Sequence, residues 1–415
     1  MAQLSDDCFA FGGPMLTVEE AGALIRARLN AVSERERVAL AQADGRVLAQ
    51  DVIAGHPLPP FANSAVDGYA ARFDDLSTQG ETRLRIIGRV EAGAVAAPLA
   101  AGAAARVFTG APTPPGADVV FMQEDVRVEA GEAVLPAGLK RGANLRPAGE
   151  DVAQGACALG EGVVLRPQDL ALAAALGLAH VDVVRRLRVG VFSTGNELAE
   201  PGAPLGPAQI YDSNRVMLLT LLRRLGCEAR DLGPLRDEPA TLAAALKAAA
   251  AQCDLIVTSG GVSTGEADHV KAAVESVGSL VFWRIAVKPG RPVAMGVIDG
   301  AAFVGLPGNP AASFVTFACV LRPLVFAMMG AEAPSPLALP VRADFSYRKK
   351  AGRREFVRAS LIETAEGLVA RKFAREGAGL LSSLTQTDGL VVLGEDVLRV
   401  EPGEVVRFLP YSALA

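Results

Sequence analysis

The chain contains 415 residues, of which 50% are hydrophobic and 21% charged, and its formal net charge is -5 at pH 7. This composition is typical of a globular protein with large cores, and the length predicts roughly two to four domains. Because the net charge is acidic and no long basic run occurs, we expect binding to neither nucleic acid nor an anionic membrane. The five cysteines form no Cys-x-x-Cys pair and the three histidines no metal-binding spacing, so we expect reduced thiols and no structural zinc site.

The start of the sequence does not resemble a targeting segment. It lacks a basic stretch followed by an apolar run and a small-residue cleavage site, so we expect no signal peptide. Alanine-rich stretches such as 240–251 are interrupted by polar residues and are too short to span a bilayer. These features favour a cytoplasmic protein.

The N-terminal half combines helices with a β-rich stretch. An amphipathic helix is predicted at 17–30, where Thr17 and Glu20 fit a capping box. Short β-type runs separated by Gly- and Pro-rich turns then predict a small β-rich module from about 46 to 136, inserted into or attached to a helical neighbour. The β-type runs are 84–87, 106–109 and 119–122, and a helix at 168–177, stopped by Gly177, and a strand at 181–184 follow them.

Residues 188 to about 330 repeat a strand, a loop and a helix. Strands that alternate with helices predict a mostly parallel sheet covered on both faces, so the fold class is α/β. The predicted strands are 188–192, 228–232, 254–258 and 302–305, the helices are 213–225, 239–252, 267–277 and 311–329, and 280–285 forms a hairpin with 293–297.

A Pro- and Ala-rich linker at 333–340 precedes the last part of the chain. Alternating apolar and polar residues there predict strands that form a small β-barrel or sandwich. These strands are 338–345, 355–362, 367–373, 389–393 and 404–408.

Polar and glycine-rich loops follow four of the predicted parallel strands. In open α/β sheets, ligands bind beyond the carboxyl ends of the strands, so the four loops are expected to share one edge. Their glycines allow close backbone approach, and free N–H groups at the helix starts attract anions. These loops are 193–198, 235–238, 259–268 and 305–310.

Glu197, Asp237 and Asp268 would bring carboxylates into the same crevice. Carboxylates beside a phosphate site usually imply a divalent cation, commonly Mg²⁺. Alternatives stay open, because Asp237 and Asp268 each also suit the start of a helix and a single glycine-rich loop is commonly a routine turn. Four such loops on one edge make a phosphate site the stronger interpretation.

Basic side chains form a second set of candidates. Lys288 and Arg291 lie in a turn fixed by proline and glycine, from which both cations can project into one place. Arg354, Arg358 and Ser383 lie in the C-terminal module. Arg or Lys combined with hydroxyls suits a tetrahedral oxyanion such as molybdate, although each cation taken alone is more commonly a solvated surface charge.

Three residues of the N-terminal half are weaker candidates when taken singly. Asp67 precedes a glycine in the loop-like segment 59–70. Thr109 ends a predicted strand before a glycine turn, and Arg146 lies near two acids in the segment 144–151.

Together these segments resemble one family. They read PPFANSAVDGYA, RVFTGAPTPPGADVV, NLRPAGEDV, STGNEL, IYDSNR, SGGVSTGEADHV, KPGRP and GLPGNP, and they follow one another along nearly the whole chain. The combination resembles the molybdopterin molybdenumtransferases, the MoeA family, which includes the E domain of gephyrin. The resemblance implies an elongated homodimer whose active site joins the α/β domain of one subunit to the N-terminal module of the other.

The resemblance also implies domains and an activity. The activity is the insertion of molybdate into the dithiolene of adenylylated molybdopterin, with Mg²⁺ and with release of AMP. Implied partners are the adenylyltransferase that supplies this substrate and the apoenzymes that receive the cofactor. The implied domains are a linking subdomain (1–45 and 137–187), a lid-like β-rich subdomain (46–136), a molybdopterin-binding α/β domain (188–330) and a C-terminal β-barrel (331–415).

Site residues follow by matching positions. The resemblance implies catalytic roles for Asp67, Thr109, Glu197, Asp237, Asp268 and Lys288, and it assigns Mg²⁺ to Asp237 and Asp268. It implies a molybdate pocket of Lys288, Arg291, Arg358 and Ser383. The implied substrate-binding residues are Arg146, Ser193, Thr194, Gly195, Ser259, Gly260, Gly261, Val262, Ser263, Pro307, Gly308, Asn309 and Pro310.

The sequence departs from the family pattern at Asn196, Arg284 and Arg291, where Asp, Lys and Lys are common. The two arginines keep the charge but carry a bulkier, forked group, so the geometry of anion binding is expected to shift. Asn196 removes one carboxylate, which weakens the case for a metal role at that position.

Two other functions stay open. One is an ATP-using adenylyltransferase, the role of the isolated α/β domain, although the lid-like module and the barrel argue against it. The other is a non-catalytic scaffold, although the retained charges of Asp67, Asp237 and Lys288 argue for chemistry. Molybdate and tungstate differ too little in size and charge for the sequence to distinguish them.

Overall fold

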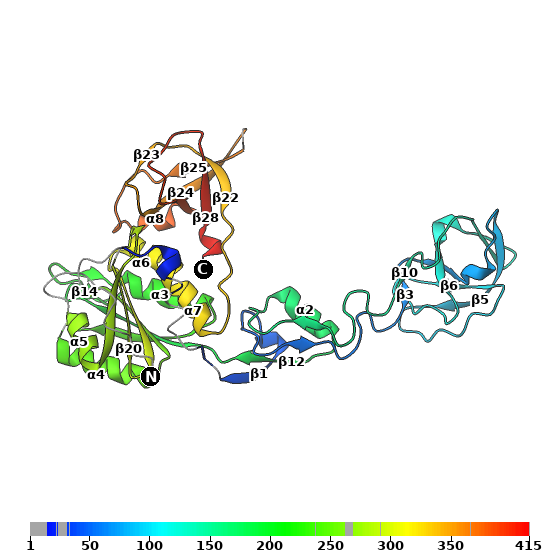
Figure 1. Ribbon diagram of the computed structural model, residues 1–415, viewed down its shortest axis with the longest axis horizontal. Helices are drawn as coiled ribbons and strands as arrows, with labels where there is room; N and C mark the ends of the chain where they lie inside the picture. The colour runs from blue at the N-terminus through cyan, green and yellow to red at the C-terminus, as the bar shows by residue number, and fades with distance from the viewer. Residues whose placement is uncertain are drawn as a thin grey trace.

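The computed structural model describes residues 15–21, 23, 31–32, 34–236, 238–261, 269–290, 292–365 and 367–414. Figure 1 shows a long, bent molecule in which the α/β domain and the C-terminal barrel are stacked at one end. A small module with β1, β12 and α2 lies in the middle, and a β-rich module lies at the far end. We call the middle part (34–61 and 147–187) the linking module and the far part (62–146) the outer module.

The outer module is built on a six-stranded sheet of order β7-β4-β6-β5-β9-β8. Only a glycine fits at Gly68, because an added Cβ would lie 1.8 Å from the carbonyl oxygen of Phe121 on the paired strand. The predicted strands at 84–87 and 119–122 are confirmed, and the one expected at 106–109 begins and ends earlier. The strands are β4 (Gly68–Ala71), β5 (Thr82–Val90), β6 (Ala103–Val107), β7 (Val119–Met122), β8 (Arg127–Glu129) and β9 (Glu132–Leu135).

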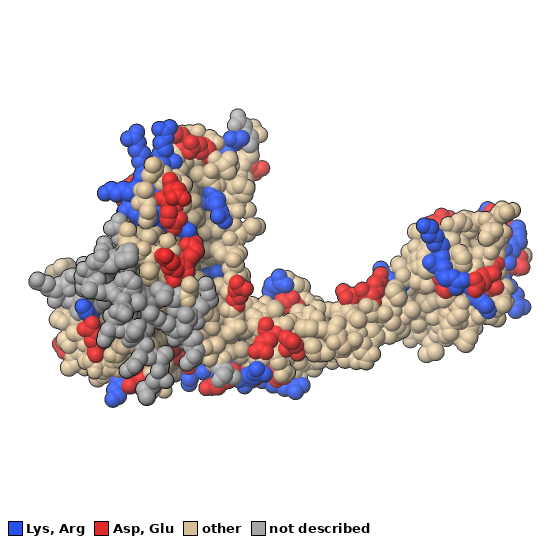
Figure 2. All heavy atoms as spheres, in the orientation of Figure 1, with Lys and Arg blue, Asp and Glu red and all other residues tan. Residues whose placement is uncertain are grey.

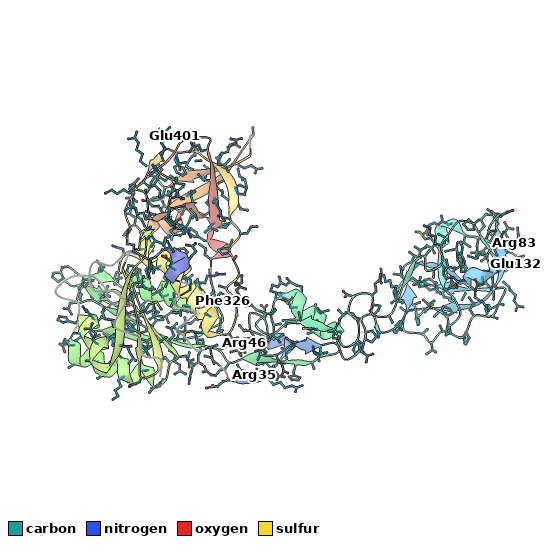
Figure 3. The ribbon with its side chains drawn as sticks, viewed as in Figure 1. Arg35, Arg46, Arg83, Glu132, Phe326 and Glu401 are labelled. Carbon is teal, nitrogen blue, oxygen red and sulfur yellow. The ribbon has the colours of Figure 1, made fainter. Side chains whose placement is uncertain are left out.

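Two passes of the chain connect the outer module to the rest. They form the antiparallel pairs β1–β12 and β2–β11, and they pair again as β3–β10 where they enter the outer module. Figure 3 places Arg46 of the linking module between Phe326 of α7 (Arg322–Met328) and Arg83 of the outer module. The predicted helix at 168–177 is α2 (Pro167–Ala175), followed by Gly177 with a φ of 79°. The strands are β1 (Arg35–Ala39), β2 (Val52–Ile53), β3 (Asn63–Ser64), β10 (Leu145–Arg146), β11 (Cys157–Leu159) and β12 (His180–Val184).

The α/β domain has a six-stranded sheet of order β16-β13-β17-β21-β20-β18. The first four strands are parallel and the last two form an antiparallel hairpin, which confirms the predicted mostly parallel sheet. The strands are β13 (Arg188–Thr194), β16 (Glu228–Leu235), β17 (Leu255–Ser259), β18 (Gly278–Arg284), β20 (Pro292–Ile298) and β21 (Ala301–Leu306), and the helices are α3 (Ser213–Arg224), α4 (Pro239–Ala250), α5 (His269–Val277), α6 (Pro310–Thr316) and α7 (Arg322–Met328).

Alternation along the strands divides this core into two layers. Val189 and Val191 of β13 pack with α3 and α7, whereas Phe192 packs with Leu242 of α4 on the other face. Both layers are therefore apolar, as expected for a sheet covered by helices on both faces.

The helical stretch Pro310–Met328 passes through the domain. It differs from the continuous helix predicted at 311–329, because a π-helical turn at Phe317–Leu321 separates α6 from α7. Among the described residues it is the one helix long and apolar enough to cross a membrane, but 83% of its most apolar window is buried inside the protein. These contacts identify it as a core helix of the α/β domain.

The first described residues also pack on the α/β domain. Thr17 and Glu20 form the predicted capping box, with hydrogen bonds of 2.8 Å and 3.1 Å between each backbone N–H and the other side chain. Leu16 forms a bridge with Ile285, and Ala21 belongs to the buried cluster around β13. Residues 24–30 of the predicted helix lie outside the described residues.

The C-terminal part is a closed barrel, which confirms the predicted small β-barrel. The order β24-β25-β22-β28-β26 closes through a further pairing of β24 with β26, and β19 (Val287–Lys288) of the α/β domain adds to β24 in parallel. The barrel strands are β22 (Leu339–Ala343), β24 (Arg354–Thr364), β25 (Gly367–Lys372), β26 (Gly389–Leu393) and β28 (Val405–Pro410); β23 (Tyr347–Arg348), β27 (Arg399–Val400) and α8 (Ser382–Thr385) accompany them.

Candidate functional site

The ends of the parallel strands lie side by side. Ser193 is in register with Ser259, Thr194 with Leu235, and Ser259 with Leu306. The four glycine-rich and polar loops therefore leave the sheet at one edge, as the sequence predicts. We call these strand ends the glycine edge.

Asn214, in the first turn of α3, joins two loops of this edge. Its side-chain amide donates to the Ser259 hydroxyl at 2.8 Å and to the Gly308 carbonyl at 2.7 Å. Asn214 Oδ1 and the hydroxyls of Ser193 and Thr194 are buried and have no hydrogen-bond partner among the described residues. Buried polar atoms are nearly always paired, so these atoms fit a bound ligand. The sequence analysis missed Asn214, although it lies in the quoted segment IYDSNR.

The backbone approaches closely at Gly260 and Gly261. Both have positive φ angles, of 94° and 66°. A Cβ on Gly261 would lie 2.4 Å from Cγ2 of Val270 and 2.6 Å from Oγ1 of Thr194. Gly195 is restricted by its backbone, because its φ of 148° disfavours any side chain, whereas the exposed Glu197 carboxylate 2.5 Å from an added Cβ could move away. Glycine therefore keeps the space beside Thr194 open.

The loop that contains Glu197 is held by a buried arginine, Arg215. Its guanidinium donates to Asp212 at 2.8 Å, to Glu200 at 2.5 Å and to Asp231. Burial alone would lower the pKa of Arg215, but these hydrogen bonds outweigh it and raise the pKa. The charged group stays ionised and fixes the loop beside the glycine edge, while Glu197 itself is exposed.

The helix start after 305–310 is not an open anion cradle. The N–H of Ala311 donates to the carbonyl of Ala378, in the barrel, at 2.9 Å. Gly308 and Asn309 are exposed, whereas Pro307 is buried. The expectation of a free N–H cradle is therefore wrong at Ala311, because the barrel already caps the helix there.

Lys288 lies where the α/β domain meets the barrel. Its Nζ is 3.1 Å from the hydroxyl oxygen of Tyr347 and 3.4 Å from Oε2 of Glu355. Glu355 is 1% exposed and also accepts hydrogen bonds from Tyr347 and Arg353 at 2.7 Å. Burial would raise the pKa of Glu355, but these donors lower it, so the buried carboxylate is ionised and anchors Lys288.

Arg358 and Ser383 lie beside this junction. Arg358 donates from Nε to the Ser383 hydroxyl at 3.1 Å and from Nη2 to the carbonyl of Gly377 at 2.9 Å. Burial lowers the pKa of Arg358, and no carboxylate of the described residues forms an ion pair with it. Ser383 is fully buried and donates to Leu380, so it orients Arg358.

A third cation, Lys372, completes what we call the basic cluster (Lys288, Arg358 and Lys372). Its Nζ lies 5.4 Å from the centroid of the Tyr347 ring, and that of Lys288 lies 5.6 Å from the same centroid. Figure 2 shows many basic side chains at the upper end of the barrel, whereas this cluster lies near the junction with the α/β domain at its lower end. The structure thus brings the predicted oxyanion residues Lys288, Arg358 and Ser383 together.

Asp67 and Thr109 meet in the outer module, although they are 42 residues apart. Asp67 Oδ1 accepts hydrogen bonds from the backbone N–H and the hydroxyl of Thr109, both at 2.8 Å. These bonds lower the pKa of Asp67, which is therefore ionised. Arg146 is exposed on β10, also in the outer module. Within one chain these residues lie at the opposite end of the molecule from the glycine edge (Figure 1).

Five predicted site residues lie outside the described residues, namely Asp237, Val262, Ser263, Asp268 and Arg291. Both candidate Mg²⁺ ligands are among them. In the described parts of the chain, no group of three or more His, Cys, Asp or Glu side chains is placed to hold a metal ion.

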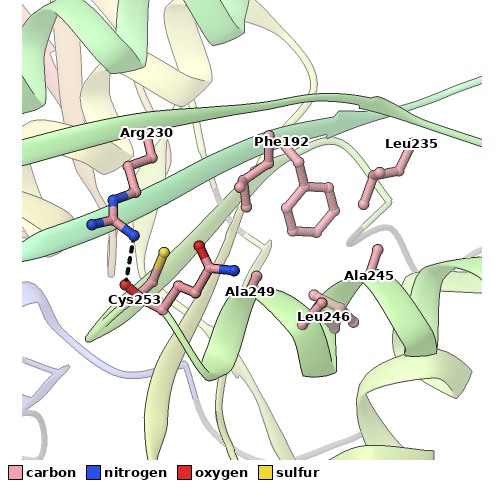
Figure 4. Close-up of a pocket in the computed structure, with 10 residues that line it drawn as sticks. Phe192, Arg230, Leu235, Ala245, Leu246, Ala249 and Cys253 are labelled. Carbon is pink, nitrogen blue, oxygen red and sulfur yellow. Dashed lines mark hydrogen bonds between the residues drawn. The ribbon is translucent and has the colours of Figure 1, made fainter.

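A cavity of about 240 Å³ lies between β13, β16 and α4, on one face of the sheet. Figure 4 shows its mostly apolar lining, with Phe192, Leu235 and Leu246, and Arg230 closing one end. Arg230 donates there to the carbonyl of Gln252 at 3.0 Å. The apolar lining does not suit a phosphate, so this cavity is not part of the site.

Family models match three parts of the chain. The MoeA N-terminal region (domain I and II) matches residues 16–177, the probable molybdopterin binding domain matches 190–327, and the MoeA C-terminal region (domain IV) matches 340–411. The matches cover the outer and linking modules, the glycine edge and the barrel.

Whole proteins are similar over nearly the full length. A molybdopterin molybdenumtransferase of Haemophilus influenzae is 39% identical over 96% of this chain and 100% of that protein. Molybdopterin molybdenumtransferase 2 of Mycobacterium tuberculosis is 37% identical over 88% of this chain and 92% of that protein. The crystal structure of the molybdopterin biosynthesis MoeA protein of Pyrococcus horikoshii matches with a TM-score of 0.82 and 30% identity, over 96% of this chain and 100% of that one. The chain belongs to the molybdopterin molybdenumtransferases, the MoeA family of transferases in molybdenum cofactor biosynthesis.

Proposed function

We propose that this transferase inserts molybdate into adenylylated molybdopterin and releases AMP, with Mg²⁺. The observation that carries the proposal is the meeting of the glycine edge and the basic cluster. Arg358 holds the carbonyl of Gly377, and the next residue, Ala378, caps the helix that follows the loop 305–310. A phosphate at the glycine edge and an oxyanion at the basic cluster are therefore neighbours.

Each part of the chain has a separate task. Gly260, Gly261 and the unpartnered hydroxyls of Ser193 and Thr194 bind the phosphates of the substrate. Lys288 and Arg358 bind molybdate by charge and forked hydrogen bonds. Holding the two reactants side by side supplies much of the rate acceleration. The dithiolene sulfurs replace an oxygen of molybdate, which leaves as water with the two thiol protons, and a second water cleaves the phosphoanhydride to give AMP.

One observation at the glycine edge supports a magnesium ion there. The buried Oδ1 of Asn214 has no hydrogen-bond partner among the described residues, and amide oxygens are ligands that hard cations accept. Asp237 comes two residues after β16, and Asp268 immediately precedes α5, so both positions follow strands of this edge. These two carboxylates would hold Mg²⁺, which offsets the charge of the phosphates.

The proposed active site is shared between two subunits of a homodimer. Asp67 and Thr109 belong to the outer module, which lies at the opposite end of the molecule from the α/β domain in Figure 1, too far to reach the glycine edge of its own chain. A second chain supplies them. The dimer would work in the cytoplasm, receive its substrate from an adenylyltransferase and pass its product to cofactor-dependent apoenzymes.

The test is AMP release from adenylyl-molybdopterin by the purified protein, with and without micromolar molybdate and Mg²⁺. We expect release that depends on molybdate and that is lost in Arg358→Met. The matched control is Arg399→Met, a change on the exposed strand β27 of the same barrel. Arg399→Met should release AMP at the wild-type rate.

The competing functions give different results in the same assay. Formation of adenylyl-molybdopterin from ATP and molybdopterin without molybdate would replace this proposal by an adenylyltransferase. No AMP release from an intact dimer, under any oxyanion, would favour a scaffold.

A further inference from the structure

We propose that Lys372 is a third ligand of the oxyanion and that Glu376 occupies the anion position in the basic cluster until the oxyanion displaces it. This inference rests on the proposed molybdate pocket and adds to it a carboxylate of the same chain that competes with the oxyanion. Neither residue belongs to the site that the sequence predicts.

Lys372 is placed by the barrel next to Arg358. It lies at the end of β25, opposite Ala359 of β24, and the N–H of Phe373 donates to the Arg358 carbonyl at 2.9 Å. The ammonium groups of Lys372 and Lys288 both interact with the Tyr347 ring, at similar distances from its centroid. Two ammonium groups thus share one ring and a guanidinium lies on the adjoining strand, which favours an anion there in addition to the Glu355 carboxylate already paired with Lys288.

Glu376 supplies such an anion. Its Oε1 lies 2.9 Å from Nζ of Lys372, and the next residue, Gly377, is held by Arg358 at 2.9 Å. The pKa of Glu376 is lowered first by Lys372 and also by Lys288 and Arg358, so its carboxylate lies in the field of all three cations. The side chain of Glu376 is nonetheless 64% exposed, so it can leave the cluster without unfolding anything.

Glu376 therefore competes with any anion that enters the basic cluster, and we call this competition the gate. With Glu376 in place, the charge of Lys372 is offset, while Glu355 offsets that of Lys288, so the cluster attracts other anions less strongly. A dianion that enters competes with one tethered carboxylate, and it wins because it offers two charges and four oxygens to the same donors. Monoanions, with one charge, compete less well. Glu376 therefore raises the selectivity of the pocket at the expense of its affinity.

Binding of sodium molybdate, measured by calorimetry and by the molybdenum retained in ultrafiltration, tests the gate without any turnover. We expect Glu376→Gln to bind molybdate about three- to tenfold more tightly and Lys372→Met to bind it about tenfold more weakly. In the Lys372→Met background, Glu376→Gln should change the affinity less than twofold. Charge-matched controls are Glu363→Gln and Lys350→Met, exposed changes in the same barrel that should leave the affinity unchanged.

The outcomes separate this inference from the proposed function. Unchanged or weaker molybdate binding in Glu376→Gln, together with loss of binding in Arg358→Met, overturns the gate and leaves the pocket in place. Binding that is insensitive to Arg358→Met overturns the pocket as well, as does the absence of binding in every variant. An equal gain in Glu376→Gln and Glu363→Gln would show a general charge effect and also overturn the gate.

Discussion

The side-chain amide of Asn214 donates a 2.8 Å hydrogen bond to the hydroxyl of Ser259, a residue at the end of another strand. The same amide nitrogen reaches the carbonyl of Gly308 at 2.7 Å. One buried amide thus fixes the spacing of two glycine-containing loops, and its free Oδ1 stays available to a ligand.

Asn214→Asp should disturb both loops. A carboxylate has no N–H to donate, so Gly308 loses its donor and a charge is buried beside it. We expect the free energy of unfolding to fall by about 1–3 kcal/mol and KM for adenylyl-molybdopterin to rise more than kcat falls. Urea unfolding and steady-state kinetics measure the two effects, with the exposed Thr220→Ala on the same helix as control. Wild-type KM in Asn214→Asp would contradict this role.

Gly261→Ala should fill the space that the glycine keeps open. The added methyl group would meet Val270 at 2.4 Å and Thr194 at 2.6 Å, and the residue has a φ of 66°. Gly300→Ala carries a similar backbone cost, because its φ is 90° and nothing lies within 4 Å of the added atom. We expect Gly300→Ala to lose about 1 kcal/mol of stability and Gly261→Ala about 2–4 kcal/mol, because of its added contacts, and only Gly261→Ala to lose substrate binding. Equal binding by the two variants would show that the loop does not contact substrate.

Mixed dimers test the shared active site. Asp67→Asn and Arg358→Met should each be inactive alone, because they damage opposite halves of the same site. When the two proteins are unfolded and refolded together, half of the dimers are hybrids, and each hybrid has one intact site. We expect AMP release at about a quarter of the wild-type rate. A mixture as inactive as its components would place the whole site within one chain.

Asp254→Asn should remove a pH-dependent ion-pair interaction that connects the linking module to the α/β domain. Asp254 accepts hydrogen bonds from the side chains of Arg185 and Arg188 at 2.9 Å each. Burial would raise the pKa of Asp254, but these donors outweigh it and hold the pKa well below its usual range. At pH 7 the free energy of unfolding of the variant should be roughly 2–4 kcal/mol lower than that of the wild type.

The stabilisation that Asp254 provides should decrease as the pH is lowered. The pKa of Asp254 is lower in the folded than in the unfolded chain, so its stabilisation is complete above the unfolded value of about 4. It is lost as the pH falls below that value through the folded pKa. The difference between wild type and Asp254→Asn should therefore shrink towards about pH 2, whereas the exposed control Asp44→Asn should match wild type throughout. A difference that stays constant on acidification would contradict this account.

The sequence predicts the α/β domain well because its signals are local. Buried strands such as Leu255–Ser259 are continuous apolar runs, and each is followed by a glycine or a polar turn and then by a helix. The parallel arrangement follows from that alternation, and with it the shared edge of the four loops. Lys288, Arg358 and Ser383 were expected together only through the family resemblance, and the structure places them together.

Other features depend on contacts between distant residues and leave no local pattern. The capping of Ala311 by Ala378 joins two domains and closes a helix start that seemed open in the sequence. The strands β3 and β10 have two residues each, which is too short for any periodicity. Glu376 lies in a charged stretch that resembles ordinary surface, and only its position near Lys372 distinguishes it.

The linking module is a long connection between the α/β domain and the outer module. One end of the module is anchored by the ion pairs of Arg185 and Arg188 with Asp254, and the outer module, which contains Asp67, is attached to the other end. A rotation of a few degrees at the anchored end would therefore displace Asp67 by a much larger distance. In the proposed dimer, the carboxylate of Asp254 thereby helps to position Asp67 in the active site of the neighbouring subunit. Substitutions at these ion pairs are expected to lower turnover by misalignment, at a distance from every reacting atom.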